Sequence, residues 1–296
     1  MAYATVNQFK HYYEWVTSGQ PQPTGKPIMV FIHGWGGSSR YWESTAKALS
    51  DTFDCLLYDM RGFGRSIENA HETPSLAQSP ETKEELSYEL ESYAEDLVRL
   101  LDTLELGQIY LNAHSMGASV GTFFLNLQGD RVKKAILTCS GIFEYDEKAF
   151  NAFYKFGGYV VKYRPRWLYK LPLMDRLFMQ RFLHRPLSGE ISRAFLDDFL
   201  MADYNAALGT IFTCVSKKAA EVMPDEFAQL KVPTLLVSGE YDVIIPPELG
   251  RYAAELNDKI EYFLIPNTAH FPMLEDAPTY LQKVREFLAV NNPAQV

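Results

Sequence analysis

The chain alternates short apolar runs, each followed by glycine or another turn residue, with longer segments whose apolar residues recur at helical spacing. The runs cover 26–37, 53–64, 107–115, 132–141, 232–240 and 259–267, and their β-branched and aromatic residues are typical of buried strands. Residues 87–106 show one apolar helical face, formed by Leu90, Tyr93, Ala94, Leu97, Leu100, Leu101 and Leu104. This alternation predicts an α/β fold, with a mostly parallel central sheet and helices on both faces.

Two segments depart from this alternation. Residues 7–19 have the pattern of a half-exposed antiparallel strand. Residues 141–224 are aromatic-rich and helix-like, contain no convincing buried strand, and are interrupted by Pro165, Pro172 and Pro186. We therefore expect a core made of residues 1–140 and 225–296, with a helical cap at 141–224 over the carboxyl ends of the strands. A turn-rich surface loop is expected at 73–82.

Length and composition limit the class of protein. With 296 residues, 47% of them hydrophobic, the chain can bury a large core as one domain with an insertion. It has no apolar run of about 18 residues and no secretory signal pattern at its start, so the expected location is the cytoplasm. A net charge of −9 argues against a general nucleic-acid binder. Three scattered cysteines fit neither a disulfide framework nor a zinc site.

Ser115 stands at a predicted strand-to-helix turn, in the stretch LNAHSMGAS at 111–119. A tight turn of this kind projects its central side chain outward and needs small flanking residues, which Ala113 and Gly117 provide. The pattern matches the nucleophile elbow G-x-S-x-G except that alanine replaces the first glycine. An ordinary helix-capping serine is the alternative that this short pattern leaves open.

Two downstream residues complete a candidate catalytic set with Ser115. A serine hydroxyl becomes a strong nucleophile when a histidine takes its proton and a carboxylate orients that histidine. Asp242 follows one predicted strand and His270 follows the next, so the candidates occur in the chain order serine, acid, histidine. Glu240 is a rival acid, and a turn aspartate and a surface histidine are the alternative interpretations.

These motifs together resemble the α/β-hydrolase superfamily, in particular its cap-bearing serine hydrolases. The resemblance covers nearly the whole chain outside the cap: HGWGG, DMRGFGRS, the elbow, GEYDVIIP and NTAHFPMLEDAP. It implies an oxyanion hole made by the backbone N–H groups of Trp35 and Met116, and it calls for no metal, flavin or nucleotide. His33 and Arg61 are expected to hold neighbouring loops by hydrogen bonds.

The expected activity is hydrolysis of carboxylic esters of small or lipid-like apolar substrates. The elbow residue is serine rather than aspartate, which argues against an epoxide hydrolase or a haloalkane dehalogenase. The same three residues would also serve a carbon–carbon bond hydrolase, a lyase similar to the menaquinone-pathway synthase, or a cofactor-free perhydrolase. A non-catalytic small-molecule receptor on this fold is a further alternative. The sequence indicates no oligomeric state.

Basic residues gather in the predicted cap. Residues 148–193 contain ten lysines and arginines against two acidic residues, so this segment is +8 and the rest of the −9 chain is −17. The basic residues alternate with tyrosine, tryptophan, phenylalanine, leucine and methionine at 154–186. One interpretation is a solvated helix face; the second is peripheral contact with an anionic membrane; the third is attraction of a soluble anionic substrate.

Overall fold

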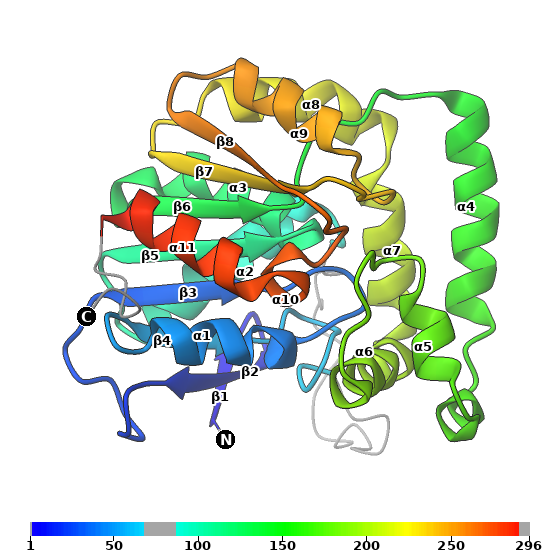
Figure 1. Ribbon diagram of the computed structural model, residues 1–296, viewed down its shortest axis with the longest axis horizontal. Coiled ribbons are helices and arrows are strands. Elements are labelled where there is room, and N and C mark those ends of the chain that lie inside the picture. The colour runs from blue at the N-terminus through cyan, green and yellow to red at the C-terminus, as the bar shows by residue number, and fades with distance from the viewer. Residues whose placement is uncertain (1, 68–86, 290–296) are drawn as a thin grey trace, which may run out of the picture.

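An eight-stranded β-sheet forms the centre of the computed structural model, which describes residues 2–67 and 87–289 (Figure 1). The strands lie in the order β1-β2-β4-β3-β5-β6-β7-β8. Their bounds are β1 Ala2–Val6, β2 Phe9–Val16, β3 Ile28–Ile32, β4 Asp54–Tyr58, β5 Ile109–His114, β6 Val132–Thr138, β7 Thr234–Gly239 and β8 Ile260–Ile265. Strands β3 to β8 are mutually parallel, so the predicted parallel sheet is confirmed. The loop expected at 73–82 lies outside the described residues.

The N-terminal part of the chain forms a hairpin rather than a single strand. β2 pairs antiparallel with β4, as expected, but β1 pairs antiparallel with β2 and adds a further strand at the sheet edge. The turn residues Asn7 and Gln8 have φ values of 51° and 64°. Positive φ at both turn positions gives the twist that joins two antiparallel strands through two residues.

Alternate strand residues point to opposite faces of the sheet. Both faces carry apolar side chains, and helices cover each of them. On β3, Val30 and Ile32 enter one apolar cluster, whereas Met29 and Phe31 enter the other. The first cluster includes side chains of α2 (Leu90–Thr103), α3 (Met116–Gln128), α8 (Lys217–Ala228) and α9 (Pro247–Glu255). The second includes side chains of η1 (Ser39–Trp42), α1 (Glu43–Leu49) and α11 (Ala277–Leu288). The short elements η2 (Gly129–Arg131) and α10 (Pro272–Glu275) lie in connections.

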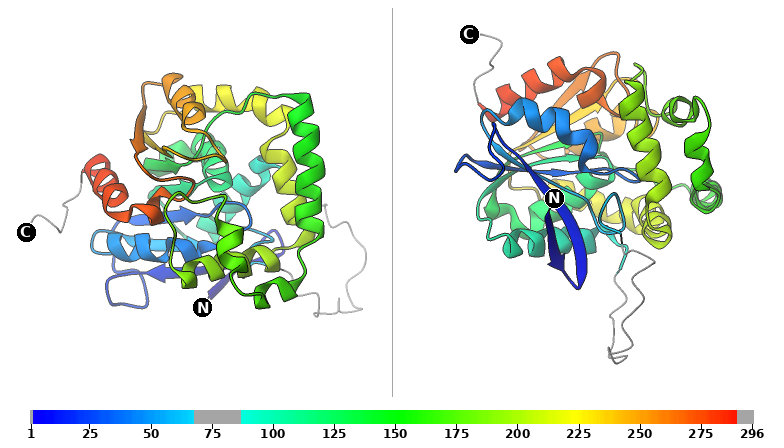
Figure 2. Two further views of the ribbon diagram at one scale, coloured as in Figure 1. Left: turned by 45° about the vertical axis from the view of Figure 1, so that its right-hand side comes forward. Right: turned by 90° about the horizontal axis from the view of Figure 1, so that it is seen from below.

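The chain between β6 and β7 is helical and contains no strand anywhere in 139–233, all of which the structure describes. Five helical elements precede α8 in this segment: α4 (Glu147–Lys162), η3 (Arg166–Lys170), α5 (Met174–Met179), α6 (Gly189–Met201) and α7 (Tyr204–Cys214). These elements lie beyond the carboxyl ends of the parallel strands, with α4 outermost (Figures 1 and 2). None of the helices in the described ranges combines the length and apolar character needed to cross a bilayer.

The expected cap boundary at residue 224 falls inside helix α8. Pro224 is accommodated within this helix, which buries Met223 and Phe227 in the cluster beside the sheet. Helix α8 also contacts α3 and α9, which cover the sheet. A boundary at 224 would divide one packed helix, so we propose that the cap ends between α7 and α8.

Candidate active site

Ser115 occupies a strained turn between β5 and α3. Its backbone has φ 54° and ψ −125°, a conformation that L residues adopt rarely and at a cost of about 1–3 kcal/mol. The Ser115 N–H donates to the carbonyl oxygen of Thr138 on the neighbouring strand β6, at 2.9 Å. The Ser115 side chain forms no capping hydrogen bond to α3, so the helix-cap alternative fails.

The small residue after this turn is required by the close approach of α3 to β3. A Cβ atom on Gly117 would lie 2.3 Å from the His33 carbonyl oxygen and 2.9 Å from the Ile32 side chain. Real Cβ atoms do not approach a backbone oxygen so closely. Glycine at 117 therefore lets the helix begin directly behind Ser115, which is the local geometry that the sequence predicted.

The structure brings Ser115, His270 and Asp242 together in one hydrogen-bonded chain. Ser115 Oγ lies 3.0 Å from His270 Nε2, and His270 Nδ1 lies 2.7 Å from Asp242 Oδ2. With the Nδ1 proton donated to the carboxylate, Nε2 accepts the hydrogen bond of the serine hydroxyl. Glu240, the rival acid, accepts instead from the N–H of Asn267.

Asp242 is held as a carboxylate by several donors. Its Oδ1 accepts the N–H groups of Ile244 and Ile245 at 2.8 and 3.0 Å, which leaves Oδ2 for His270. Burial alone raises the pKa of Asp242, but His270 and these N–H donors outweigh it, so this pKa lies below its ordinary value. An ionised carboxylate fixes the His270 tautomer and stabilises a positive charge on the ring.

Glu275 supports the loop that carries His270, and sequence reasoning did not identify it. Its carboxylate is buried and accepts the backbone N–H groups of Ala269 and Phe271 on one oxygen and those of His184 and Arg185 on the other. One side chain thus ties the His270 loop to the connection between α5 and α6. In the sequence this glutamate resembles any acidic residue at the start of a helix.

A second hydrogen-bonded chain ends at the backbone of His270. The N–H of Gly34 donates to the hydroxyl of Tyr41, and that hydroxyl donates to His114 Nδ1 at 2.9 Å. His114 Nε2 then donates to the backbone carbonyl oxygen of His270 at 2.7 Å. Burial lowers the pKa of His114 far below its ordinary value, in agreement with this neutral, singly protonated ring. Tyr41 was not identified from the sequence, since no short motif contains it.

The loop-holding roles expected for His33 and Arg61 fit their contacts. His33 Nδ1 lies 2.8 Å from the Gly34 oxygen, and His33 Nε2 accepts the Met60 N–H at 2.9 Å. Arg61 Nε is paired with the buried carboxylate of Asp96 at 2.8 Å. Both side chains are buried, and neither lines the pocket that contains Ser115.

Of Trp35 and Met116, the residues expected to form an oxyanion hole, Trp35 lines the same pocket as Ser115 and Met116 directly follows Ser115 in the chain. Met116 is the first residue of α3, where helical geometry leaves the backbone N–H without an intrahelical acceptor. The Trp35 N–H donates to no backbone oxygen within the described part of the chain. Trp35 is held by its side chain, because its indole N–H donates to the Ala207 oxygen of α7 at 2.9 Å.

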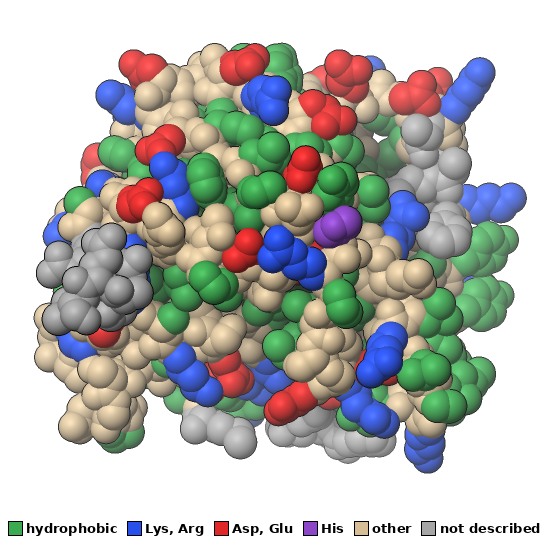
Figure 3. Space-filling view, viewed as in Figure 1, with side chains coloured by type: hydrophobic (Ala, Val, Ile, Leu, Met, Phe, Trp, Pro, Cys, Tyr) green, Lys and Arg blue, Asp and Glu red, His purple; other side chains and the backbone are tan. Residues whose placement is uncertain are grey.

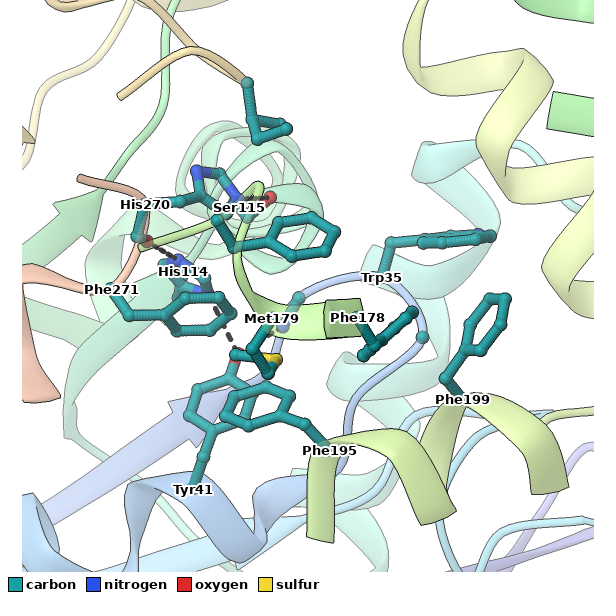
Figure 4. A pocket seen from close by; sticks show the side chains of 14 residues that line it. Trp35, Tyr41, His114, Ser115, Phe178, Met179, Phe195, Phe199, His270 and Phe271 are labelled. Carbon is teal, nitrogen blue, oxygen red and sulfur yellow. Dashed lines mark hydrogen bonds between the residues drawn. The ribbon is translucent and has the colours of Figure 1, made fainter. Parts of the chain in front are cut away.

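A pocket with aromatic walls opens over Ser115 (Figure 4). Its cavity has a volume of about 90 Å³. The core contributes Ser115, His270 and the Gly34–Gly36 loop, while α5, α6 and their connection contribute the opposite wall. That wall consists of Phe178, Met179, Phe182, Phe195 and Phe199. The pocket can therefore hold an apolar group beside the side chains of Ser115 and His270.

His114, Cys139 and His270 form one group with potential metal-ligating atoms within 4.8 Å of one another, among the described residues. Its donor chemistry does not suit a metal ion. Both nitrogens of His114 are already used by Tyr41 and by the His270 carbonyl. Burial raises the pKa of the Cys139 thiol far above its ordinary value, whereas a metal needs the thiolate. We interpret the group as part of the hydrogen-bonded support of the site.

Comparison with known proteins identifies the fold family of the chain. The model of the family described as alpha/beta hydrolase fold matches residues 27–277. The pimeloyl-[acyl-carrier protein] methyl ester esterase of Vibrio cholerae is 24% identical over 278 residues, which cover 92% of this chain and 96% of that protein. Two solved structures share the fold. An esterase from Exiguobacterium antarcticum has a TM-score of 0.76 and 17% identity, covering 97% and 98% of the two chains. A bromoperoxidase from Bacillus anthracis has a TM-score of 0.77 and 22% identity, covering 97% and 99%.

Proposed function

The chain belongs to the alpha/beta hydrolase fold family, and we propose that within this family it is a serine hydrolase of carboxylic esters. The observation that carries the proposal is the hydrogen-bonded chain from Ser115 through His270 to Asp242, with Ser115 at a strained turn beneath an apolar pocket. The Vibrio cholerae relative, named as a methyl ester esterase, supports an ester as the substrate.

In the proposed reaction, Ser115 Oγ attacks the ester carbonyl carbon while His270 Nε2 takes the hydroxyl proton. The carbonyl oxygen becomes an oxyanion, which the N–H groups of Trp35 and Met116 stabilise. His270 then gives its proton to the leaving alkoxide, and the alcohol departs from an acyl-enzyme. A water molecule, deprotonated by His270, attacks the acyl carbon, and the returning proton restores the Ser115 hydroxyl as the acid leaves.

The pocket favours an apolar acyl or alcohol group. Its outer wall is formed by phenylalanine and methionine, and no lysine or arginine is among its lining residues. A cavity of about 90 Å³ accommodates a short chain without movement of this wall. We therefore expect short acyl esters to be hydrolysed in the observed conformation, and longer lipid-like esters to require displacement of α5.

The test is turnover of p-nitrophenyl esters in a series from acetate to laurate, with wild type, Ser115→Ala and Ser119→Ala. Ser119 lies one turn further along α3, so its variant is the matched control. We expect Ser115→Ala to lose on the order of 10⁶ in kcat and Ser119→Ala to retain wild-type activity. A fluorophosphonate probe should label wild type and Ser119→Ala but not Ser115→Ala.

Three outcomes would overturn the proposal. Wild-type activity in Ser115→Ala would show that Ser115 is not the nucleophile. Single-turnover acylation of wild type without further hydrolysis would favour a receptor. Slow ester turnover together with rapid bromination of a test compound in the presence of hydrogen peroxide, a carboxylic acid and bromide would favour a perhydrolase, because the peracid that it forms oxidises bromide.

A further inference from the structure

The outer surface of the segment between β6 and β7 exposes large apolar side chains. Five of them are more than half exposed, from 51% for Tyr159 to 65% for Leu173. The five residues, which we call the outer apolar set, are Tyr159, Tyr163, Trp167, Leu173 and Leu177. Apolar side chains protrude among basic ones along the edge of the molecule over α4 and the elements that follow it (Figure 3). Exposed patches of this kind mark interaction surfaces.

Packing inside the protein does not account for the outer apolar set. Neighbours of its members in the sequence, namely Val160, Leu168, Met174 and Phe178, point inward and pack against Leu196, Phe199 and Leu200 of α6. The segment therefore has two apolar faces, one buried against α6 and one exposed to solvent. A polar outer face would serve the fold equally well.

Leu173 is the member of the outer apolar set that the fold explains least. Its backbone has φ 62° and ψ 4°, the left-handed conformation in which glycine or asparagine is favoured over leucine. Its side chain is also 65% exposed, so little packing offsets the backbone strain. Neither local conformation nor core packing explains a leucine at this turn, whereas contact with an apolar medium outside the protein would.

Exposed basic side chains accompany the outer apolar set. Lys162, Arg166, Lys170 and Arg176 are exposed, and within the described residues none of the four forms an ion pair. They belong to the +8 segment of a chain whose remainder is −17. The molecule therefore presents a positive, apolar surface on one side, and a solvated helix face would have no need of the apolar part.

Arg164 has a different role, although the sequence places it among these residues. Its guanidinium donates to the Phe199 and Ala202 carbonyl oxygens at the end of α6 and lies over the Phe199 ring. It is a structural side chain and is not available to a ligand. Arg185 and Arg193 are likewise engaged, with Asp276 and with Tyr169 respectively.

We propose that the outer apolar set and these four basic residues bind the surface of a membrane that contains anionic lipid. Apolar side chains that enter the headgroup region, flanked by cations that meet lipid phosphates, are the two components of interfacial binding. A nucleic acid or a small soluble anion would use the charges but would gain little from exposed leucines at 173 and 177. The acidic remainder of the molecule would turn this surface toward the bilayer.

Helix α5 would couple membrane binding at this surface to the shape of the pocket over Ser115. This helix has six residues, and its two faces serve both sites: Phe178 and Met179 line the pocket, whereas Leu177 is in the outer apolar set. Only the thickness of one short helix separates the proposed lipid contact from the pocket. Under the proposed function, displacement of α5 at a bilayer would widen the pocket for a lipid-like ester.

The experiment measures co-sedimentation of the purified full-length protein with vesicles, either of phosphatidylcholine alone or with about a third phosphatidylserine, at low and high salt. Wild type should bind the anionic vesicles at low salt, and less well at high salt or without phosphatidylserine. Arg166→Gln combined with Lys170→Gln should weaken binding about 30-fold, since each basic residue near an anionic surface contributes about 1 kcal/mol. Leu173→Ser combined with Leu177→Ser should weaken binding without any change of charge.

Two controls keep the result specific. Lys133→Gln combined with Lys259→Gln makes the same charge change at the amino ends of β6 and β8, away from this surface, and should bind as wild type does. Ser115→Ala should also bind as wild type does, so a failure of the proposed function leaves the membrane test intact. In vesicles with brominated acyl chains, Trp167 fluorescence should be quenched, and Trp167→Phe should lose that part of the signal.

The proposal is overturned if wild type stays in the supernatant with anionic vesicles at low salt. It is also overturned if the Lys133/Lys259 variant weakens as much as the Arg166/Lys170 variant, because binding would then follow net charge alone. Sedimentation equilibrium on the same preparations tests whether a second copy of the chain binds this surface instead of a membrane. Self-association that disappears in the Leu173/Leu177 variant, without vesicle binding by wild type, would assign this surface to a second copy of the chain.

Discussion

His114 donates a hydrogen bond from Nε2 to the backbone carbonyl oxygen of His270, at 2.7 Å. The proton must be on Nε2, because a carbonyl oxygen can only accept; Nδ1 of the neutral ring then accepts from the Tyr41 hydroxyl, whose oxygen accepts the Gly34 N–H. The residue before the proposed nucleophile thus fixes the backbone of the proposed base. The same hydrogen-bonded chain reaches Gly34, next to Trp35, so the proposed nucleophile, the proposed base and one proposed oxyanion donor share one support.

We expect His114→Asn to lower kcat by about 10- to 100-fold with little change in KM. Asparagine can still accept a hydrogen bond close to the Cβ atom, but it cannot reach the His270 carbonyl oxygen. A base displaced by a fraction of an ångström loses much of its effect, while ester binding in the aromatic pocket is retained. Steady-state kinetics with the best p-nitrophenyl ester measure both constants. A kcat within about twofold of wild type would show that His114 does not position His270.

Replacement of Asp242 by asparagine should lower kcat by about 10⁴, because the amide cannot hold the His270 tautomer that accepts the Ser115 proton. Glu240→Gln is the matched control, since Glu240 lies two residues away and its carboxylate accepts from the Asn267 N–H rather than from His270. It should retain activity to within a few-fold. If Glu240→Gln were the more damaging change, the assignment of the acid would be wrong.

The parallel strands and the three-residue site were predictable from sequence for a shared reason. Strands buried on both faces appear as continuous apolar runs, and the residues that follow them meet at one sheet edge. Ser115, Asp242 and His270 each follow such a run. Strand β1 was missed because it is short and half-exposed, so its apolar alternation is weak.

Other features depend on contacts between distant residues. Tyr41 reaches His114 across 73 positions, and Glu275 reaches His184 across 91. Each is an ordinary residue type in its local sequence, so no pattern distinguishes it. The basic segment shows the same limit: Arg164 and Arg166 are alike in the sequence, yet the first supports α6 and the second is exposed.

Gly117→Ala should destabilise the protein by about 1–3 kcal/mol, because the new methyl group would lie 2.3 Å from the His33 carbonyl oxygen and force α3 away from β3. Activity should fall as well, since the same shift moves Ser115 and the Met116 N–H. Gly107→Ala is the matched control: a Cβ there meets nothing within 4 Å. Thermal unfolding followed by circular dichroism compares the two. An unchanged Tm in Gly117→Ala would mean that the helix start does not depend on this close approach.

The protein should lose stability as the pH falls below about 6.5, and His114 should contribute to the loss. Burial lowers the pKa of His114 well below 6.5 in the folded state, whereas the unfolded chain takes up a proton near the ordinary value. The unfolded state therefore binds more protons below pH 6.5, and the free energy of unfolding decreases by up to about 1.4 kcal/mol per pH unit for such a histidine. Above pH 6.5 the stabilisation is fully present. His33, whose pKa burial also lowers, acts in the same direction.

Measurement of Tm between pH 8 and pH 5 tests this for wild type, His114→Asn and His184→Asn, of which the last changes an exposed histidine. His114→Asn will have a lower Tm at pH 8, because a buried hydrogen bond is lost, but its Tm should fall less steeply below pH 6.5. The difference in slope should be roughly 2–4 °C per pH unit. His184→Asn should keep the wild-type slope. Parallel pH profiles for wild type and His114→Asn would mean that His114 is not held neutral, and that the proton order in its hydrogen-bonded chain is different.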